Sequence, residues 1–342
     1  MSNLSIKTVS TIHEIDPAAW DHLSNGRPFQ SHRWYVYGER VMADCPPLYL
    51  LAYDREYLVA RASLWLVRNE PLPKMLGPMR KIAQPILTRW PLLICRSPLA
   101  YTSGLALPDN TMRTEILPLI AKAALDTANE HGGSFIVFDY LKKADTNGWP
   151  DFFSVMPTSD PGTMMENCWA SMDEYFASGG KKDRQHYKRV LREAGKLGIQ
   201  MHRHLQVKNI EQVLPLIRNV ETNHGALPNP WARQMLEHMK IVGGSFLTAT
   251  IGDQLVGCGL LLEDNNSQMT SILGLAEDIP YVYFTLVYES LKIAFEHNVR
   301  LLRWGSGAYD IKQRLGFSLE DNGSISFAAV NTFLQKVIRW LN

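Results

Sequence analysis

The sequence predicts a mixed α/β protein built from two copies of one domain. Helical and strand-like segments alternate along the 342 residues, a pattern typical of domains that pack helices on a central sheet. In both halves a hairpin, a helix and a buried strand follow in the same order, and both helices end in Glu-His, at positions 130–131 and 296–297. An internal repeat of this size indicates that one fold was duplicated.

The composition fits a globular protein without a dominant charge. Hydrophobic residues make up 46% of the chain, charged residues 20%, and the formal net charge is +1. This balance provides no global field for DNA, so any polyanion site must be local. The chain shows no signal-peptide core and no run of about 18 apolar residues, so we expect no membrane span and a cytoplasmic location. Four scattered cysteines without a C-x-x-C pair predict reduced thiols and no metal site.

The first copy is predicted to occupy residues 1–164. Its first helix begins after Asp16, a capping carboxylate followed by a proline at the first helical position. The predicted elements are a strand over 5–15, a helix from 16, a helix over 29–41, hairpin strands over 49–53 and 57–67, a helix over 111–130 and a strand over 134–140. Six prolines fall within 68–100, so we interpret that segment as an insertion into the first copy only, and we expect it to cover the acceptor site.

The second copy is predicted to occupy residues 165–342 and to be entered through a basic helix over 181–198. The elements around that helix are strands over 165–169 and 199–205, helices over 209–224 and 230–242, hairpin strands over 245–252 and 254–262, a strand over 267–275, a helix over 281–296, a strand over 299–304 and a short helix over 309–317. On the basic helix a cationic stripe of Arg184, Lys188 and Arg192 lies opposite an apolar stripe of Tyr187, Val190, Leu191, Ala194 and Leu197. We expect the helix to dock by the apolar stripe and to expose the cationic stripe.

Two segments of the second copy carry a family resemblance. One is the run ASMDEYFASGGKKDRQHYKRVLREAGKLGIQ, and the other is the pattern Gly-x-Gly-x-Tyr-x-x-Lys-x-x-x-Gly-Phe over 305–317. Together they resemble the Fem-type, two-domain branch of the GNAT superfamily, over about residues 165–320. The resemblance implies two tandem GNAT-like domains, a reaction site in a cleft, and transfer of an acyl or aminoacyl group to an amine or hydroxyl. The acceptor would be a small molecule or a cell-wall precursor.

The turn after the strand over 267–275 bears on the donor. Superfamily members that use acyl-CoA carry a Gln/Arg-x-x-Gly-x-Gly/Ala loop, whose backbone N–H groups bind the pyrophosphate. Residues 273–280 are instead Leu-Gly-Leu-Ala-Glu-Asp-Ile-Pro, with one glycine and two acids. This departure favours aminoacyl-tRNA as the donor and no tightly bound cofactor. Acyl-CoA is the alternative donor, and a non-catalytic binding protein that retains the fold is a further interpretation.

The glycine junction before the short helix supplies the first candidate site residues. We predict that Lys312 faces the reacting carbonyl and stabilises the charge that develops on its oxygen, with Tyr309 beside it. Gly305 and Gly307 would let the backbone approach a ligand closely. The competing interpretation is that Lys312 is a surface lysine and Tyr309 a packing aromatic.

A second set of candidates lies on helices. Glu221 or His224 would accept a proton from the attacking amine, although helix capping explains either residue alone. The cationic stripe would hold tRNA phosphates, unless it is merely a solvated helix face. Tyr283 and Trp34 are predicted to contact substrate, with core packing as the alternative for Trp34.

Three further polar residues are assigned no function. His202 and His204 share a strand face without a third ligand, so we interpret them as surface histidines. Cys258 lies among apolar strand residues and is expected to be an inert, buried thiol.

Overall fold

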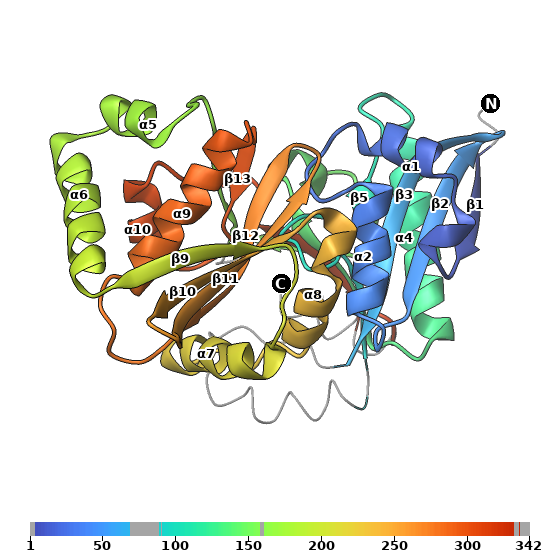
Figure 1. The fold of residues 1–342 in the computed structure, drawn as a ribbon. Coiled ribbons are helices and arrows are strands. Elements are labelled where there is room, and N and C mark those ends of the chain that lie inside the picture. The colour runs from blue at the N-terminus through green and yellow to red at the C-terminus, as the bar shows by residue number, and fades with distance from the viewer. Residues whose placement is uncertain (1–3, 69–88, 90, 158–160, 332–334, 336–342) are drawn as a thin grey trace. The chain divides into compact units, whose positions relative to one another are not determined.

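The computed structural model describes residues 4–68, 89, 91–157, 161–331 and 335, and it divides into two compact units (Figure 1). Unit 1 comprises Met1–Pro161 and Glu320–Asn342, and unit 2 comprises Gly162–Leu319. The predicted boundary after residue 164 therefore falls close to the observed one. The prediction that the second copy continues to residue 342 is wrong, because the strand Ser324–Ala329 pairs within the sheet of unit 1.

Unit 1 is a mixed sheet in the order β1-β2-β3-β4-β6-β15-β7, with β5 paired to β3. Its strands are β1 (Leu4–Val9), β2 (Pro47–Asp54), β3 (Tyr57–Val67), β4 (Leu92–Cys95), β5 (Leu105–Ala106), β6 (Phe135–Leu141), β7 (Ser154–Pro157) and β15 (Ser324–Ala329). Its helices are α1 (Pro17–Ser24), α2 (His32–Val41) and α4 (Arg113–Glu130), with 3-10 turns η1 (Ile12–Glu14) and η3 (Lys143–Thr146). The Asp16 carboxylate accepts from the N–H groups of Ala18 and Ala19, as the capping signal predicts.

Unit 2 repeats this arrangement in the order β9-β10-β11-β12-β13-β8-β14. Its strands are β8 (Thr163–Glu166), β9 (Ile199–His204), β10 (Ser245–Ile251), β11 (Gln254–Asp264), β12 (Ser267–Leu275), β13 (Leu301–Arg303) and β14 (Ser318–Leu319). Its helices are α5 (Met172–Ser178), α6 (Lys181–Lys196), α7 (Ile210–Asn223), α8 (Ala232–His238), α9 (Val282–Glu296) and α10 (Tyr309–Arg314), with the 3-10 turn η4 (Met239–Val242).

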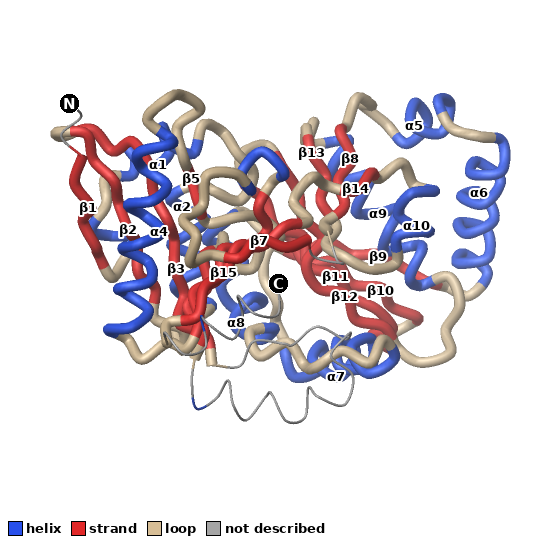
Figure 2. The backbone as a smooth tube through the Cα atoms, turned by 180° about the vertical axis from the view of Figure 1, so that it is seen from behind, coloured by secondary structure: helices blue, strands red, loops and turns tan. Residues whose placement is uncertain are grey.

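The two sheets confirm the predicted duplication and add an exchange of strands. The pairs β4–β6 and β12–β13 are the parallel ones, and each stands at the same place in its sheet. Beyond them, β15 follows β6 in unit 1, whereas β8 follows β13 in unit 2. Figure 2 shows β15 beside β7. The last strand of each copy therefore completes the sheet of the other.

Two glycines fix which helix covers which face of the unit 2 sheet. A Cβ on Gly257 would lie 2.4 Å from Val282 Cγ1 of α9, and a Cβ on Gly274 would lie 3.0 Å from the Ile217 nitrogen of α7. Only glycine allows both helices to approach this closely. The helices α9 and α10 lie on one side of the sheet and α7 on the other, as Figure 1 shows.

Two local predictions need correction. The supposed insertion over 68–100 includes β4, which pairs with β3 and β6 in the middle of the sheet; residues 69–88 and 90 of that segment lie outside the described residues. On α6, Val190 and Ala194 are buried, but Leu191 and Leu197 are exposed. Half-buried His186 and Glu193 lie on the packed side of α6 instead. The face of α6 that packs against the rest of unit 2 is therefore rotated about the helix axis relative to the predicted apolar stripe. It is also more polar than that stripe.

Across the described residues, no helix combines the length and apolarity that crossing a membrane requires.

Candidate functional site

Strands β12 and β13 part in the middle of the unit 2 sheet. Their parallel pairing begins at Ser267–Leu301 and ends at Met269–Arg303, while β12 continues to Leu275. A bulge in β12 next to Thr270 shifts its register against β11. One position beyond the last pair, Thr270 Oγ1 and Trp304 Nε1 are buried and make no hydrogen bond in the described part of the chain. Buried polar atoms normally have partners, so these two atoms are an exception in the middle of the sheet.

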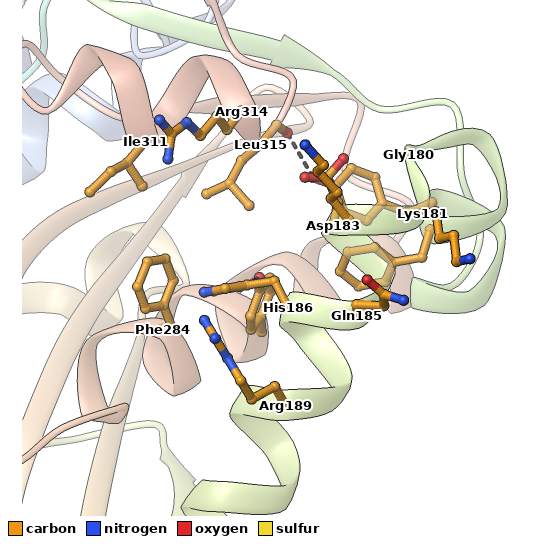
Figure 3. A pocket seen from close by; sticks show the side chains of 14 residues that line it. Gly180, Lys181, Asp183, Gln185, His186, Arg189, Phe284, Ile311, Arg314 and Leu315 are labelled. Atoms are coloured by element: carbon orange, nitrogen blue, oxygen red, sulfur yellow. Dashed lines mark hydrogen bonds between the residues drawn. The ribbon is translucent and has the colours of Figure 1, made fainter.

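A pocket of about 1020 Å³ lies wholly within unit 2, between the helices on the β13 side (Figure 3). Its lining residues come from four helices and the turn between α5 and α6: Tyr175, Phe176, Gly180, Lys181, Lys182, Asp183, Gln185, His186, Arg189, Phe284, Tyr288, Ile311, Arg314 and Leu315. Figure 3 shows His186 and Arg189 projecting from α6 toward Phe284 of α9, with Ile311 and Arg314 of α10 across the opening.

The pocket joins an aromatic wall to a cationic rim. The wall consists of Tyr175, Phe176, Phe284 and Tyr288. The rim carries four cations, Lys181, Lys182, Arg189 and Arg314, against the single acid Asp183. Aromatic faces stack on planar bases, and lysine and arginine bind phosphate oxygens. The arrangement therefore suits a planar, anionic group such as the end of a nucleotide.

His186 and Tyr288 form a hydrogen-bonded pair on the pocket wall. The distance from His186 Nδ1 to Tyr288 Oη is 2.8 Å, and the Phe284 ring lies edge-on to the imidazole, with centroids 4.6 Å apart. Burial lowers the pKa of His186, Arg189 lowers it further, and Asp183 opposes the change in part. Burial, supported by Asp183 and Tyr187, raises the pKa of Tyr288 to about 12. Both side chains are therefore neutral near pH 7.

The junction between β13 and α10 is held by a buried ammonium. Lys312 Nζ donates to the carbonyl oxygens of Trp304, Gly305 and Ser306, at 2.6, 2.9 and 3.2 Å. Thr163 Oγ1 donates to the first two of these carbonyls from the neighbouring strand β8. Burial lowers the pKa of Lys312 to about 8, which leaves the amine charged at neutral pH. The junction positions α10, and with it the pocket residue Arg314.

Solved structures with a similar fold cover nearly the whole chain. FemX has a TM-score of 0.63 at 10% identity, and the match covers 97% of this chain and 99% of that chain. A tandem GNAT protein from the clavulanic acid biosynthesis pathway has a TM-score of 0.57 at 13% identity, with 96% and 99% covered. L-PGS from Bacillus licheniformis has a TM-score of 0.55 at 11% identity, with 98% and 97% covered.

The chain has a tandem GNAT-like fold. The similarity to FemX confirms the Fem-type resemblance at the level of the fold. No protein-family model matches the sequence, and no curated protein matches it either.

In this GNAT-like unit, the turn before α9 has the predicted acidic character. Glu277 and Asp278 are exposed, and Asp278 and Tyr281 adopt left-handed backbone conformations, with φ of 57° and 70°. Tyr281 occupies the N-cap position of α9 without a side-chain hydrogen bond to the helix. Two exposed carboxylates thus precede the N-terminus of α9 in the chain.

The predicted residues of the glycine junction lie near the pocket in sequence, but they do not line it. Lys312 is buried against the three carbonyls rather than exposed, so the surface-lysine alternative is excluded. Its predicted contact with a reacting carbonyl stays a prediction. Tyr309 is half-buried at the start of α10. Gly307 has φ of +80°, and a Cβ there would meet nothing within 4 Å, so the position needs glycine for its backbone conformation alone.

Glu221 and His224 lie at the C-terminal end of α7, across the sheet from the pocket. The Glu221 carboxylate accepts from Arg218 Nη1 at 2.5 Å and from the Asn229 backbone N–H at 2.8 Å, so it ties the loop after α7 to the helix. The backbone N–H of His224 caps α7, and its side chain is exposed. These contacts agree with the capping interpretation, and the proton-transfer role of either residue stays a prediction.

The structure places the two predicted aromatic substrate contacts differently, Trp34 in the core of unit 1 and Tyr283 half-buried on α9. Trp34 is fully buried in unit 1, and its indole N–H donates to the Pro98 carbonyl at 2.9 Å, so the prediction that it contacts substrate is wrong. Tyr283 is half-buried on α9, with its ring edge-on to Phe284 and the centroids 5.1 Å apart. Its predicted contact with substrate stays a prediction.

The cationic stripe of α6 is exposed as predicted, and Arg192 pairs with Glu193 at 2.9 Å. The pocket is instead lined by residues on an adjacent face of the same helix, including Gln185, His186 and Arg189. Sequence reasoning missed His186, Tyr288 and Arg314. No local signal marks them, because Phe284 and Tyr288, which pack against His186, lie far along the chain from it.

Proposed function

We propose that this protein transfers an acyl or aminoacyl group from a large anionic carrier to an amine or hydroxyl acceptor. The preferred donor is aminoacyl-tRNA, and the acceptor is a small molecule or a cell-wall precursor. The observation that carries the proposal is the unit 2 pocket, where an aromatic wall and four cations meet beside the glycine junction.

The pocket fits the terminal nucleotide of such a donor. Its volume of about 1020 Å³ is at the upper end of small-ligand sites and accommodates a nucleotide with its acyl group. The half-buried Phe284 offers a stacking face, and Arg189 and Arg314 offer phosphate contacts. Along the exposed face of α6, Arg184 and Lys188 would continue the phosphate track.

The reaction is a direct transfer. The acceptor nitrogen or oxygen attacks the ester carbonyl, a new C–N or C–O bond forms, and the C–O bond to the carrier ribose breaks. The acceptor loses a proton, and the departing ribose oxygen gains one. Binding both substrates together and stabilising the oxyanion supply the acceleration. Lys312 and Tyr309 remain candidates for the carbonyl, and Glu221 and His224 for the acceptor proton.

One of the solved neighbours is described with a donor by name. FemX and L-PGS share the fold, whereas the clavulanic acid pathway protein is described in relation to AcCoA. Acyl-CoA is therefore the second candidate donor, and the end of the β12–β13 pairing with its two unpartnered buried polar atoms favours it. The acidic turn at Glu277 and Asp278 argues against it.

Titration of the purified protein with aminoacyl-tRNA and with acetyl-CoA tests the proposal. We expect tRNA binding with a strong salt dependence, and acetyl-CoA binding weaker than about 10 µM, which corresponds to roughly 7 kcal/mol. Arg189→Ala, Arg314→Ala and Lys188→Ala should each flatten the salt dependence by about one unit of slope. Lys122→Ala, on the surface of unit 1, is the matched control and should leave it unchanged.

Tight acetyl-CoA binding would replace the preferred donor by the second candidate. Binding of tRNA without transfer to any amine or hydroxyl would indicate a non-catalytic binding protein.

A further inference from the structure

The hydrogen bond between His186 and Tyr288 determines which imidazole nitrogen faces the pocket. His186 Nδ1 is the atom 2.8 Å from Tyr288 Oη. Nε2 makes no hydrogen bond with any residue that the structure describes, and Figure 3 shows the ring extending from α6 toward Phe284 inside the pocket. The nitrogen that a ligand can reach is therefore Nε2.

The direction of this hydrogen bond follows from the phenol. Tyr288 is 4% exposed, and its hydroxyl has no other partner in the described part of the chain. A buried O–H without an acceptor costs about 1–3 kcal/mol. The phenol therefore donates to Nδ1, and the neutral imidazole carries its proton on Nε2.

The surroundings keep the imidazole neutral. The groups that line the pocket around it are the cations Lys181, Lys182, Arg189 and Arg314, the acid Asp183 and the neutral phenol of Tyr288. Together with burial, the adjacent Arg189 disfavours a further positive charge on the ring. His186 consequently presents an N–H donor, rather than a lone pair, to whatever occupies the pocket.

We propose that His186 Nε2–H donates a hydrogen bond to the carbonyl oxygen of the acyl group being transferred, and that Tyr288 is the positioning residue that holds this tautomer. The inference rests on the proposed function, which puts the donor's acyl end in this pocket. The hydrogen bond strengthens as negative charge develops on the carbonyl oxygen, so its effect appears in the transfer step. The proton stays on Nε2, and the acceptor's proton leaves by another route.

Single-turnover transfer and donor affinity are to be measured for His186→Ala, His186→Gln and Tyr288→Phe. We expect His186→Ala to slow transfer by roughly a hundredfold to a thousandfold while donor affinity changes little. The glutamine amide can still donate, so His186→Gln should recover part of the rate. His202→Ala, an exposed histidine on β9, is the matched control.

A nitrogen-15 NMR measurement of the His186 imidazole separates the positioning role from a structural one. We expect protonated Nε2 and unprotonated Nδ1 in the free protein, and a changed tautomer distribution in Tyr288→Phe with a smaller loss of rate than His186→Ala.

Two results would overturn this inference alone. One is a His186→Ala variant that transfers as fast as an active wild type, and the other is a free wild-type protein whose His186 carries its proton on Nδ1. A wild type that transfers from no donor would overturn the proposed function, and the inference with it.

Discussion

The two units share one topology but differ where their central parallel strands meet. In unit 1, β4 ends at Cys95, and the chain over 96–106 folds back until β5 pairs with β3. In unit 2, β12 runs on past its last pair with β13, and a pocket opens between the helices on that side. In unit 1 this segment therefore packs back onto β3, whereas unit 2 has a pocket between its helices.

The closure of unit 1 is tight. A Cβ on Gly38 of α2 would lie 2.2 Å from Pro98 Cγ, and one on Gly104 would lie 2.8 Å from the Arg96 backbone. Trp34 donates to the Pro98 carbonyl, which ties the loop to α2. These contacts pack the loop around Pro98 closely against α2 and β3.

Beside this loop, unit 1 buries a guanidinium. Arg61 is 0% exposed, lies 3.7 Å above the Trp20 ring, and donates to Ser24 and Gln30 at 2.9 and 2.8 Å. No carboxylate in the described part of the chain pairs with it, and its Nε has no partner. Unit 1 therefore buries this cation by packing, whereas the cations of the unit 2 pocket line a cavity.

The largest expected effect comes from Arg61→Ala. The substitution removes the cation–π contact, opens a cavity and leaves the Ser24 and Gln30 acceptors short of a donor, so unit 1 should lose about 3–5 kcal/mol of unfolding free energy. Labelling of the buried thiols against urea measures each unit separately, because Cys95 lies in unit 1 and Cys258 in unit 2. Cys95 should label at lower urea while Cys258 is unchanged.

The exposed Arg40 provides the control for Arg61, since Arg40→Ala should shift neither thiol. Equal shifts of Cys95 and Cys258 in Arg61→Ala would mean that the units do not unfold separately.

A second prediction concerns the buried ammonium of unit 2. Folded Lys312 has its pKa lowered by burial to about 8 from an ordinary 10.5, so between these values the unfolded chain binds a proton that the folded chain lacks. The contribution of Lys312 to the unfolding free energy therefore rises with pH. The difference in unfolding free energy between wild type and Lys312→Met should grow by about 1.4 kcal/mol per pH unit from pH 8 to 10.

Cys258 labelling in urea at pH 7, 8, 9 and 10 measures this difference. A constant difference would show that the three carbonyls keep the pKa of Lys312 near its ordinary value.

A pair of helical glycines gives the smallest effects and the sharpest contrast between units. Gly38→Ala forces Cβ into Pro98 and should destabilise unit 1 by about 1–3 kcal/mol. Gly195, near the end of α6 in unit 2, has nothing within 4 Å of the same Cβ. Gly195→Ala should stabilise unit 2 by about 0.5–1 kcal/mol, because alanine favours helix. The urea midpoints for labelling of Cys95 and Cys258 should move in opposite directions in the two variants. An unchanged Cys95 midpoint in Gly38→Ala would refute the tight packing of Pro98 against α2.

Much of the fold could be predicted because the sequence carries local signals for it. The Asp16 cap, both hairpins and the repeated helix ends depend on neighbours in the chain. The strands β4 and β15 could not be placed this way. Each is short, and its place in the sheet depends on partners distant in the sequence, such as β6.

The sequence predicted the basic helix and the short helix after the glycine junction as elements of the fold. The pocket, however, is lined by a face of α6 one residue away from the predicted cationic stripe. One residue rotates a helix face by 100°, and the packing of His186 against Phe284 and Tyr288 sets that rotation. No local pattern on α6 encodes this contact, because its partners lie about a hundred residues away.

The central claim is that the open unit 2, and not the closed unit 1, binds the donor. Hydrogen exchange with and without aminoacyl-tRNA tests it most directly, because it reports on both units in one experiment. We predict slower exchange over 180–189 and 309–315 on donor binding, and no change over 57–67 and 96–106. Protection confined to the unit 1 segments would contradict the account.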